Sequence, residues 1–231
     1  LLTSRGLGDV YKRQDQKMFM KRENIAERGI WTAKKRYILN VWDSEGVRYE
    51  EPKLKMMGIE AVKSSTPAPC RTMIKDALKL MMRGTEDDVI EFIENARKEF
   101  KSLPPEEIAF PRTASNVQKY KSSSDIYVKG TPIHIRGALL FNYYLRKKKL
   151  TNKYSAIENG EKIKFLYLKK PNTIQENVLS FIQDFPTEFG LSQYIDYELQ
   201  FEKSFVYPLK AILDAIGWEV EKKVTLESFF S

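Results

Sequence analysis

The chain has 231 residues, and its 39 lysines and arginines outnumber its 31 aspartates and glutamates, which gives a net charge of +8. With 42% hydrophobic and 30% charged residues it has the composition of a globular protein, and no run of about 18 uncharged apolar residues is present to cross a membrane. A single cysteine, Cys70, excludes an internal disulfide and a cysteine-ligated zinc site, and fits a reducing cytoplasm. The positive charge favours a polyanionic partner.

The first residues differ in character from the rest. Leu1 to Gln14 (LLTSRGLGDVYKRQ) contains no methionine and lacks the apolar core of a signal peptide. It resembles a translated adapter or assembly junction. We therefore interpret residues 1–14 as a non-native leader and exclude them from the fold.

The next part of the chain has strand-like patterns. Apolar residues occur on both faces of 37–42, as in a half-covered strand, and residues 43–46 (DSEG) supply turn chemistry. A return strand beginning at Val47 then gives a hairpin. We expect Pro52 to end that strand, and we expect residues 64–69 (SSTPAP) to be a connector that neither continues a strand nor opens a helix.

Two helices are predicted next. An apolar stripe at i, i+3, i+4 and i+7 is formed by Ile74, Ala77, Leu78 and Met81, and Gly84 is placed for a C-terminal cap.

The second helix has its own start and stop signals. Thr85 and Asp88 have the spacing of a capping box, and Pro104-Pro105 stops the helix. One face of it is apolar, with Val89, Phe92, Ala96 and Phe100. Because the joint between the two helices is short, we expect them to pack antiparallel.

The remaining pattern is mixed. It predicts a strand near 108–110, a polar loop at 121–125, a helix over 135–149 that ends in four cations, and a strand over 162–169. The rest is expected to be helical up to Gly217, with a break at Pro208. The predicted fold class is α+β, with small antiparallel strands followed by a mostly helical domain with a few short strands.

A self-sufficient active site is not evident. His134 is the only histidine, so any serine or cysteine triad would depend on it, and the glycine-rich phosphate loop, G-x-S-x-G and H-E-x-x-H motifs are absent. The acidic residues at 86–94 lie on a helix face, where a solvated surface is the expected role.

Three segments carry a more specific signal. They are Lys34–Val41 (KKRYILNV), residues 52–60 (PKLKMMGIE) followed by 63–67 (KSSTP), and Thr131–Asn142 (TPIHIRGALLFN). Alone, the first is an exposed strand entry, in which alternation would send Lys35 and Tyr37 to one face and Lys34 and Arg36 to the other. In order and spacing, the three resemble the palm-to-thumb junction and the thumb of family-B DNA polymerases, most closely those of tailed bacteriophages.

The resemblance implies a role for specific residues. In that family the first two segments contact primer–template DNA in its minor groove and along its phosphates, and the third lies on the product-duplex side of the thumb. Gly58 would let the backbone approach a phosphate closely. The implied DNA-binding residues are Lys34, Lys35, Arg36, Tyr37, Lys55, Gly58, His134 and Arg136.

The end of the chain carries a fourth signal. Leu226, Phe229 and Phe230 are apolar residues at i, i+3 and i+4 of a terminal tail, and burying such side chains stabilises by about 1.5–3 kcal/mol each. They resemble the clamp-binding peptide of replicative polymerases, although Lys223 stands where that peptide has glutamine. The alternative is that the tail folds back on its own thumb.

The resemblance also implies a domain organisation: residues 15–66 form the C-terminal edge of the palm, 67–220 the thumb, and 221–231 the clamp-binding tail. The family's metal-binding aspartates, nucleotide-binding helix and exonuclease domain lie upstream of Lys17. The parent is thus expected to be a DNA-directed DNA polymerase that uses two divalent metal ions, Mg²⁺, whereas this segment would contain no catalytic residue and no metal ligand.

The expected partners are primer–template DNA, a sliding clamp and the upstream palm, fingers and exonuclease domains, in the cytoplasm of a phage-infected bacterium. The alternative is a stand-alone DNA-binding or clamp-associated subunit of a split polymerase, without catalysis. A basic helical protein with no nucleic-acid role is a third reading, which the ordered motifs oppose.

Overall fold

A computed structural model of the chain describes residues 21–222. It contains two three-stranded sheets and a set of helices, which confirms the predicted α+β class. The described residues divide into two compact units, one made of residues 21–29 and 39–55, the other of residues 30–38 and 56–222. The palm, thumb and tail boundaries stay predictions. No helix within 21–222 is both long enough and apolar enough to span a membrane.

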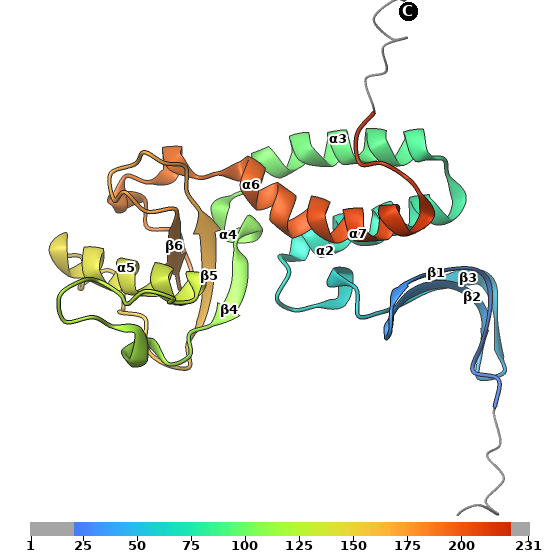
Figure 1. Ribbon diagram of the computed structural model, residues 1–231, viewed down its shortest axis with the longest axis horizontal. Helices are drawn as coiled ribbons and strands as arrows, with labels where there is room; N and C mark the ends of the chain where they lie inside the picture. Colours follow the sequence, from blue (N-terminus) through green and yellow to red (C-terminus); the bar gives the residue numbers. More distant parts are fainter. Residues whose placement is uncertain (1–20, 223–231) are drawn as a thin grey trace, which may run out of the picture. The chain divides into compact units, whose positions relative to one another are not determined.

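The first sheet has the order β1-β2-β3, with β1 at Asn24–Ala33, β2 at Arg36–Ser44 and β3 at Val47–Met57 (Figure 1). The predicted strand, turn and return strand are confirmed as β2 and β3. Their turn has Glu45 at φ 55° and Gly46 at φ 89°, the left-handed geometry that a tight hairpin favours.

Two predictions about this sheet were wrong. Lys34 and Lys35 do not enter a strand but form the turn between β1 and β2, with Lys35 at φ 61°. Strand alternation therefore does not set where their side chains point. A lysine pair without glycine or asparagine gave no turn signal, although the hairpin requires the left-handed backbone there.

Pro52 was expected to end the return strand, but β3 continues through it to Met57. β3 is an edge strand, since it pairs only with β2 in the sheet order. A proline lacks the N–H group for a ladder hydrogen bond, and an edge strand does not need that bond on its outer side.

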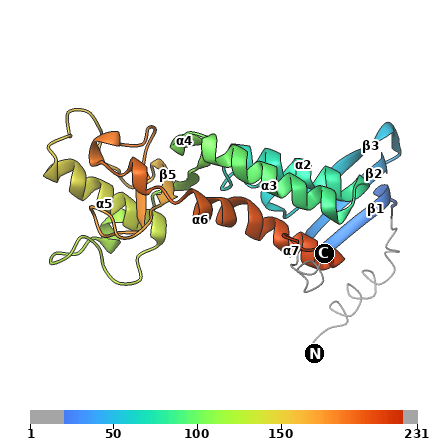
Figure 2. The ribbon, with the colours of Figure 1, turned by 90° about the horizontal axis from the view of Figure 1, so that it is seen from above.

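The helical layer begins with α2 (Ala68–Arg83) and α3 (Glu86–Ser102), which run antiparallel side by side as predicted (Figures 1 and 2). The capping box is confirmed, because Thr85 Oγ1 accepts from the Asp88 N–H group while the Asp88 carboxylate accepts from the Thr85 N–H group. The connector prediction was wrong at its end: α2 already starts at Ala68, because Pro69 lies in the first turn, where a missing N–H group costs nothing.

The last helical stretch packs beside α2 and α3 (Figure 2). It consists of α6 (Tyr197–Phe201), a π-helical turn η5 (Glu202–Val206) and α7 (Tyr207–Ile216). The predicted break at Pro208 was wrong. The π turn, in which the Tyr207 N–H group bonds the Glu202 carbonyl five residues back, precedes the proline and carries the helix past it.

A buried thiol lies in this layer. Cys70 of α2 has no exposed surface, and its Sγ atom lies 3.2 Å from Ser204 Oγ of η5. Burial is the main cause that raises the pKa of the Cys70 thiol to about 11. Cys70 therefore acts as a packing residue rather than as a nucleophile.

The second sheet has the order β4-β5-β6, all antiparallel, with β4 at Phe110–Thr113, β5 at Lys162–Tyr167 and β6 at Val178–Phe181. The predicted strand at 108–110 begins later, because the short helix α4 (Pro105–Ile108) precedes it. The prediction of helix throughout 170–217 was wrong for β6, whose four residues are all buried and too few to show a period.

Helix α5 (Ile133–Lys147) covers one face of this sheet (Figure 1). It approaches β6 closely at Gly137, where an added Cβ atom would lie 2.4 Å from Ser180 Oγ and 2.7 Å from the Ser180 backbone nitrogen. Ser180 Oγ also donates a hydrogen bond of 2.8 Å to the His134 carbonyl. These contacts fix the N-terminal end of α5 on the sheet.

Candidate nucleic-acid interface

Aromatic rings of β4 and β5 lie near the N-terminal end of α5. Phe110 and Phe165 are paired across the two strands, and their ring centres lie 5.2 Å apart in a stacked arrangement. Tyr167 meets Phe165 edge-on at 5.7 Å, and the His134 ring lies 6.4 Å from Phe165. Strand register, rather than proximity in sequence, brings these rings together.

Cations are distributed over these rings. The Arg112 guanidinium lies 5.8 Å from the Phe110 centre and 5.9 Å from the Phe165 centre. Lys203 Nζ of η5 lies 5.6 Å from the Tyr167 centre. These distances allow cation–π attraction. We call Arg112, His134, Arg136, Tyr167 and Lys203 the α5 cluster.

Two of these cations are held by neutral oxygen atoms. Arg112 donates to the carbonyl groups of Ser65 and Pro111, each at 2.8 Å. Arg136 donates to the side-chain oxygen of Asn177 and lies 5.7 Å from the Tyr127 ring centre. The fold thereby positions both guanidinium groups through neutral acceptors.

The α5 cluster retains positive charge. Within residues 21–222, none of Arg112, Arg136 and Lys203 forms an ion pair with a carboxylate. Elsewhere in the molecule such pairs are common: Arg97, for example, lies 2.7 Å from Glu198. A cation without a carboxylate partner is available to an incoming anion.

Burial shifts the pKa values of the cluster. It is the main cause that lowers the pKa of His134 below its ordinary value, and the charge of Arg112 lowers it further. Burial also lowers the pKa of Arg112, and raises that of Tyr167 against the opposing effect of Arg112 and Arg136. Protonation of His134 is therefore disfavoured in the free protein, and a phosphate bound nearby would favour it.

The turn between β1 and β2 forms a second basic group, which we call the β1–β2 turn (residues 34–37). Lys34 and Lys35 are exposed, whereas Arg36 and Tyr37 are half-buried. Arg36 is not free, because its Nη2 atom lies 2.9 Å from Glu60 Oε2. The two lysines thus carry the available charge of this turn.

Gly58 is required by this turn itself. It has φ 68°, and an added Cβ atom would lie 2.5 Å from the Lys35 carbonyl oxygen and 2.9 Å from Arg36 Cγ. Glycine is therefore needed here for an internal contact and a left-handed backbone. The sequence suggested another reason, a close approach of the backbone to a phosphate, but that reason is not needed to explain glycine at position 58.

Other predicted site residues join neither group. Lys55 belongs to the other compact unit, where its Nζ atom lies 2.8 Å from Glu23 and 3.3 Å from the Asn24 side-chain oxygen. The predicted clamp-binding residues Leu226, Phe229 and Phe230 lie outside the described residues.

Sequence reasoning missed two cations of the α5 cluster. Arg112 and Lys203 were not singled out, since strand pairing and a π turn bring them to the α5 cluster.

The described segment offers no group of three or more His, Cys, Asp or Glu side chains arranged to hold a metal ion. We place no metal-dependent step on these residues. The arrangement is suited to holding an anion.

Comparison with known proteins finds two DNA-directed DNA polymerases that are similar to this chain. No protein-family profile matches the chain. It is 32% identical over 238 aligned residues to the DNA-directed DNA polymerase of Enterobacteria phage T4, which covers 98% of this chain and 26% of that protein. It is 35% identical over 226 residues to the DNA-directed DNA polymerase of Escherichia phage RB69, which covers 92% of this chain and 24% of that protein. The chain thus spans about a quarter of the length of these relatives, and over that quarter it is a homologue of phage DNA-directed DNA polymerases.

Proposed function

We propose that this chain is the thumb and palm edge of a family-B replicative DNA polymerase and that it grips primer–template duplex by the phosphate backbone. The observation that carries the proposal is the α5 cluster, in which Arg112, Arg136 and Lys203 have no carboxylate partner among residues 21–222. Lysine and arginine that neutralise phosphates release condensed counterions, and this supplies most of the affinity for DNA of any sequence.

The β1–β2 turn has a complementary role in this proposal. Lys34 and Lys35 are exposed at the end of a narrow hairpin. Minor-groove acceptors lie in similar places on every base pair, so an ammonium group there senses correct pairing without reading sequence. Arg36 and Tyr37, the first two residues of β2, would contact the same duplex.

The proposal extends to the parent protein. Its relatives are DNA-directed DNA polymerases, so we expect the whole protein to transfer nucleotides with two Mg²⁺ ions held by residues upstream of this segment, in the cytoplasm of an infected bacterium. The tail residues Leu226, Phe229 and Phe230 would tether it to a sliding clamp, which makes rebinding of DNA intramolecular.

Fluorescence anisotropy with a labelled hairpin duplex, measured at several salt concentrations, tests the DNA grip. Neutralising three or more phosphates predicts that log affinity falls against log salt with a slope of about −3 or steeper. Affinity should not depend on duplex sequence. A flat salt response would overturn the proposal.

The clamp proposal has a separate test in a polymerase that carries this segment. Deleting 226–231 should abolish the longer products that appear when a clamp is present and leave clamp-free synthesis intact. An equal loss in both conditions would show that the tail is a structural part of the thumb.

A further inference from the structure

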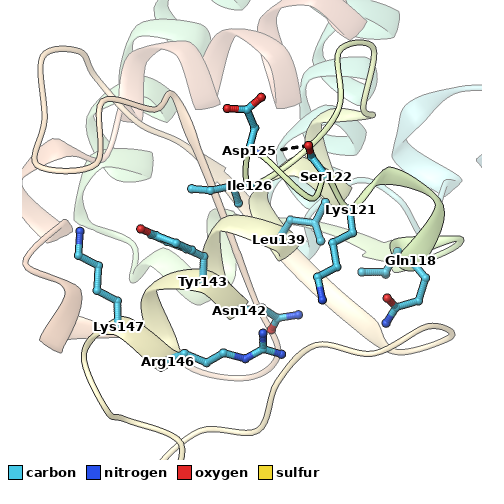
Figure 3. A pocket seen from close by; sticks show the side chains of 11 residues that line it. Gln118, Lys121, Ser122, Asp125, Ile126, Leu139, Asn142, Tyr143, Arg146 and Lys147 are labelled. Carbon is cyan, nitrogen blue, oxygen red and sulfur yellow. Dashed lines mark hydrogen bonds between the residues drawn. The ribbon is translucent and has the colours of Figure 1, made fainter.

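A pocket lies on the side of α5 that faces away from the sheet (Figure 3). Its volume is about 560 Å³, within the range of ligand-binding sites. One wall is a helical stripe of Leu139, Tyr143 and Arg146, at i, i+4 and i+7. The other wall is the segment 117–126.

The second wall is held by its own hydrogen bonds. Ser122 Oγ accepts from the Ser124 N–H group at 3.3 Å and from the Asp125 N–H group at 3.1 Å. Val117, at the start of this wall, is itself almost fully buried. A ligand would therefore meet a largely preformed pocket.

The interior of the pocket favours a planar, apolar-faced group. Val117, Ile126 and Leu139 line it with aliphatic surface. The Tyr143 side chain is 43% exposed, and Tyr144 holds its ring edge-on with centres 5.1 Å apart. An exposed, braced aromatic ring provides a stacking platform for a base.

The charge around the pocket favours an anion. Lys121 stands on one wall, and Arg146 and Lys147 stand on the other (Figure 3). The helix dipole accounts for cations at the C-terminal end of α5, but not for Lys121 on the opposite wall.

The pocket's own polar groups leave this charge available. Among the residues that the structure describes, no carboxylate pairs with Lys121 or Arg146. The one acid of the lining, Asp125, points its carboxylate away from Arg146 in Figure 3. Asn142 is occupied, because its amide exchanges hydrogen bonds of 2.8 and 2.7 Å with the Ile157 backbone.

We propose that this pocket binds one nucleotide of single-stranded DNA, with the base stacked on Tyr143 and the phosphates held by Lys121 and Arg146. The inference rests on the proposed DNA-binding function. It concerns a separate ligand, because a base that is paired and stacked in a duplex cannot enter a pocket. Since Asn142 is occupied, binding should tolerate any base.

The test uses the whole chain and a fluorescein-labelled dT oligomer of about 12 nucleotides, with hairpin duplex binding measured separately. Tyr143→Leu should weaken oligomer binding about tenfold through lost stacking, whereas Tyr143→Phe should bind like the parent. Arg146→Gln should reduce the magnitude of the salt slope by about 0.7, the value for one phosphate of a single strand. Lys98→Gln, an equal charge change at an exposed site of α3, is the control and should leave the slope unchanged.

Each outcome is decisive. Equal oligomer affinity of Tyr143→Leu and the parent, or equal slopes for Arg146→Gln and Lys98→Gln, would overturn the inference. Duplex binding without oligomer binding would overturn it while leaving the proposed function standing; loss of both would remove the proposed function as well. If the parent chain fails to bind the oligomer but binds an acidic peptide, and Tyr143→Leu and Arg146→Gln both weaken that peptide binding, the pocket belongs to a protein partner instead.

Discussion

The α5 cluster and the β1–β2 turn both concentrate basic residues, but they differ in what balances the charge. At the turn, Glu60 lies 2.9 Å from Arg36 and 2.8 Å from Lys63, so the fold itself compensates part of the charge. In the α5 cluster, Arg112 bonds carbonyl oxygens and Lys203 lies over an aromatic ring.

The difference matters for DNA. A paired cation must give up its carboxylate before it can bind a phosphate, whereas a cation without a carboxylate partner only releases counterions. We therefore expect the α5 cluster to contribute more to duplex affinity than Arg36 does. Counting lysines and arginines along the sequence would rank the two regions the other way, because the turn has the denser run.

The largest expected effect comes from Gly137, on which the α5 cluster depends. Gly137→Ala would place a Cβ atom 2.7 Å from the Ser180 backbone nitrogen, so α5 must move off β6. Overpacking of this kind costs about 2–3 kcal/mol of unfolding free energy. Urea denaturation measures it, with Arg146→Ala on the outer face of α5 as the control. If Gly137→Ala loses no more unfolding free energy than the control, α5 does not pack against β6 as closely as these distances require.

Gly58→Ala is the matching change at the β1–β2 turn. Alanine at φ 68° is strained and its Cβ atom would meet the Lys35 carbonyl at 2.5 Å, so we expect a cost of about 1–3 kcal/mol. The loss should concentrate in faster hydrogen exchange of β1 and β2. Unchanged exchange there would contradict the assigned role of this glycine.

Equal charge changes in the two regions should have unequal effects on DNA binding. Lys203→Gln removes a cation that has no carboxylate partner in the described part of the chain. It should lower the magnitude of the duplex salt slope by about 0.9, or roughly eightfold in affinity at about 0.1 M salt. Arg36→Gln removes a cation already paired with Glu60 and should change affinity less. Anisotropy at several salt concentrations compares them. A larger loss of duplex affinity for Arg36→Gln than for Lys203→Gln would contradict the proposed difference between the two regions.

The smallest expected effect is a gain in duplex affinity. Glu60→Gln frees Arg36 and Lys63 from their shared carboxylate, and we expect duplex affinity to rise about two- to threefold. Glu198→Gln makes the same charge change beside Arg97 and Lys101, outside both basic groups, and serves as the control. Equal gains in both variants would mean that only net charge matters.

Local patterns in the sequence predicted local structure well. Alternation and the 43–46 turn predicted the β2–β3 hairpin, and the Thr85 and Asp88 spacing predicted the start of α3, since each signal lies within a few residues. The predictions failed where contacts between residues far apart in the sequence determine the local structure. The four buried residues of β6 are a strand because β5 pairs with them, and Pro208 is tolerated because a π turn precedes it.

The candidate site likewise combines residues that a local motif predicted with residues that only long-range contacts bring in. His134 and Arg136 stood out within one motif, whereas Arg112 joins them only because Phe110 pairs with Phe165, 55 positions along the chain. Lys203 depends on the packing of η5. The pairing of Arg36 with Glu60 depends on the fold as well, since the two residues lie 24 positions apart and no local pattern signals their contact.

The most direct test of the α5 cluster is the NMR titration of His134, the only histidine of the chain. In the free protein, burial and Arg112 hold the pKa of His134 below its ordinary value of about 6.5. A phosphate bound at the cluster favours the imidazolium, so the pKa should rise in the duplex complex. By linkage, duplex affinity should increase as the pH falls below the pKa of the complex and level off below the pKa of the free protein. His134→Gln should abolish this pH dependence. If duplex binds while the pKa of His134 stays unchanged, the backbone does not lie at the α5 cluster, and the central claim is wrong.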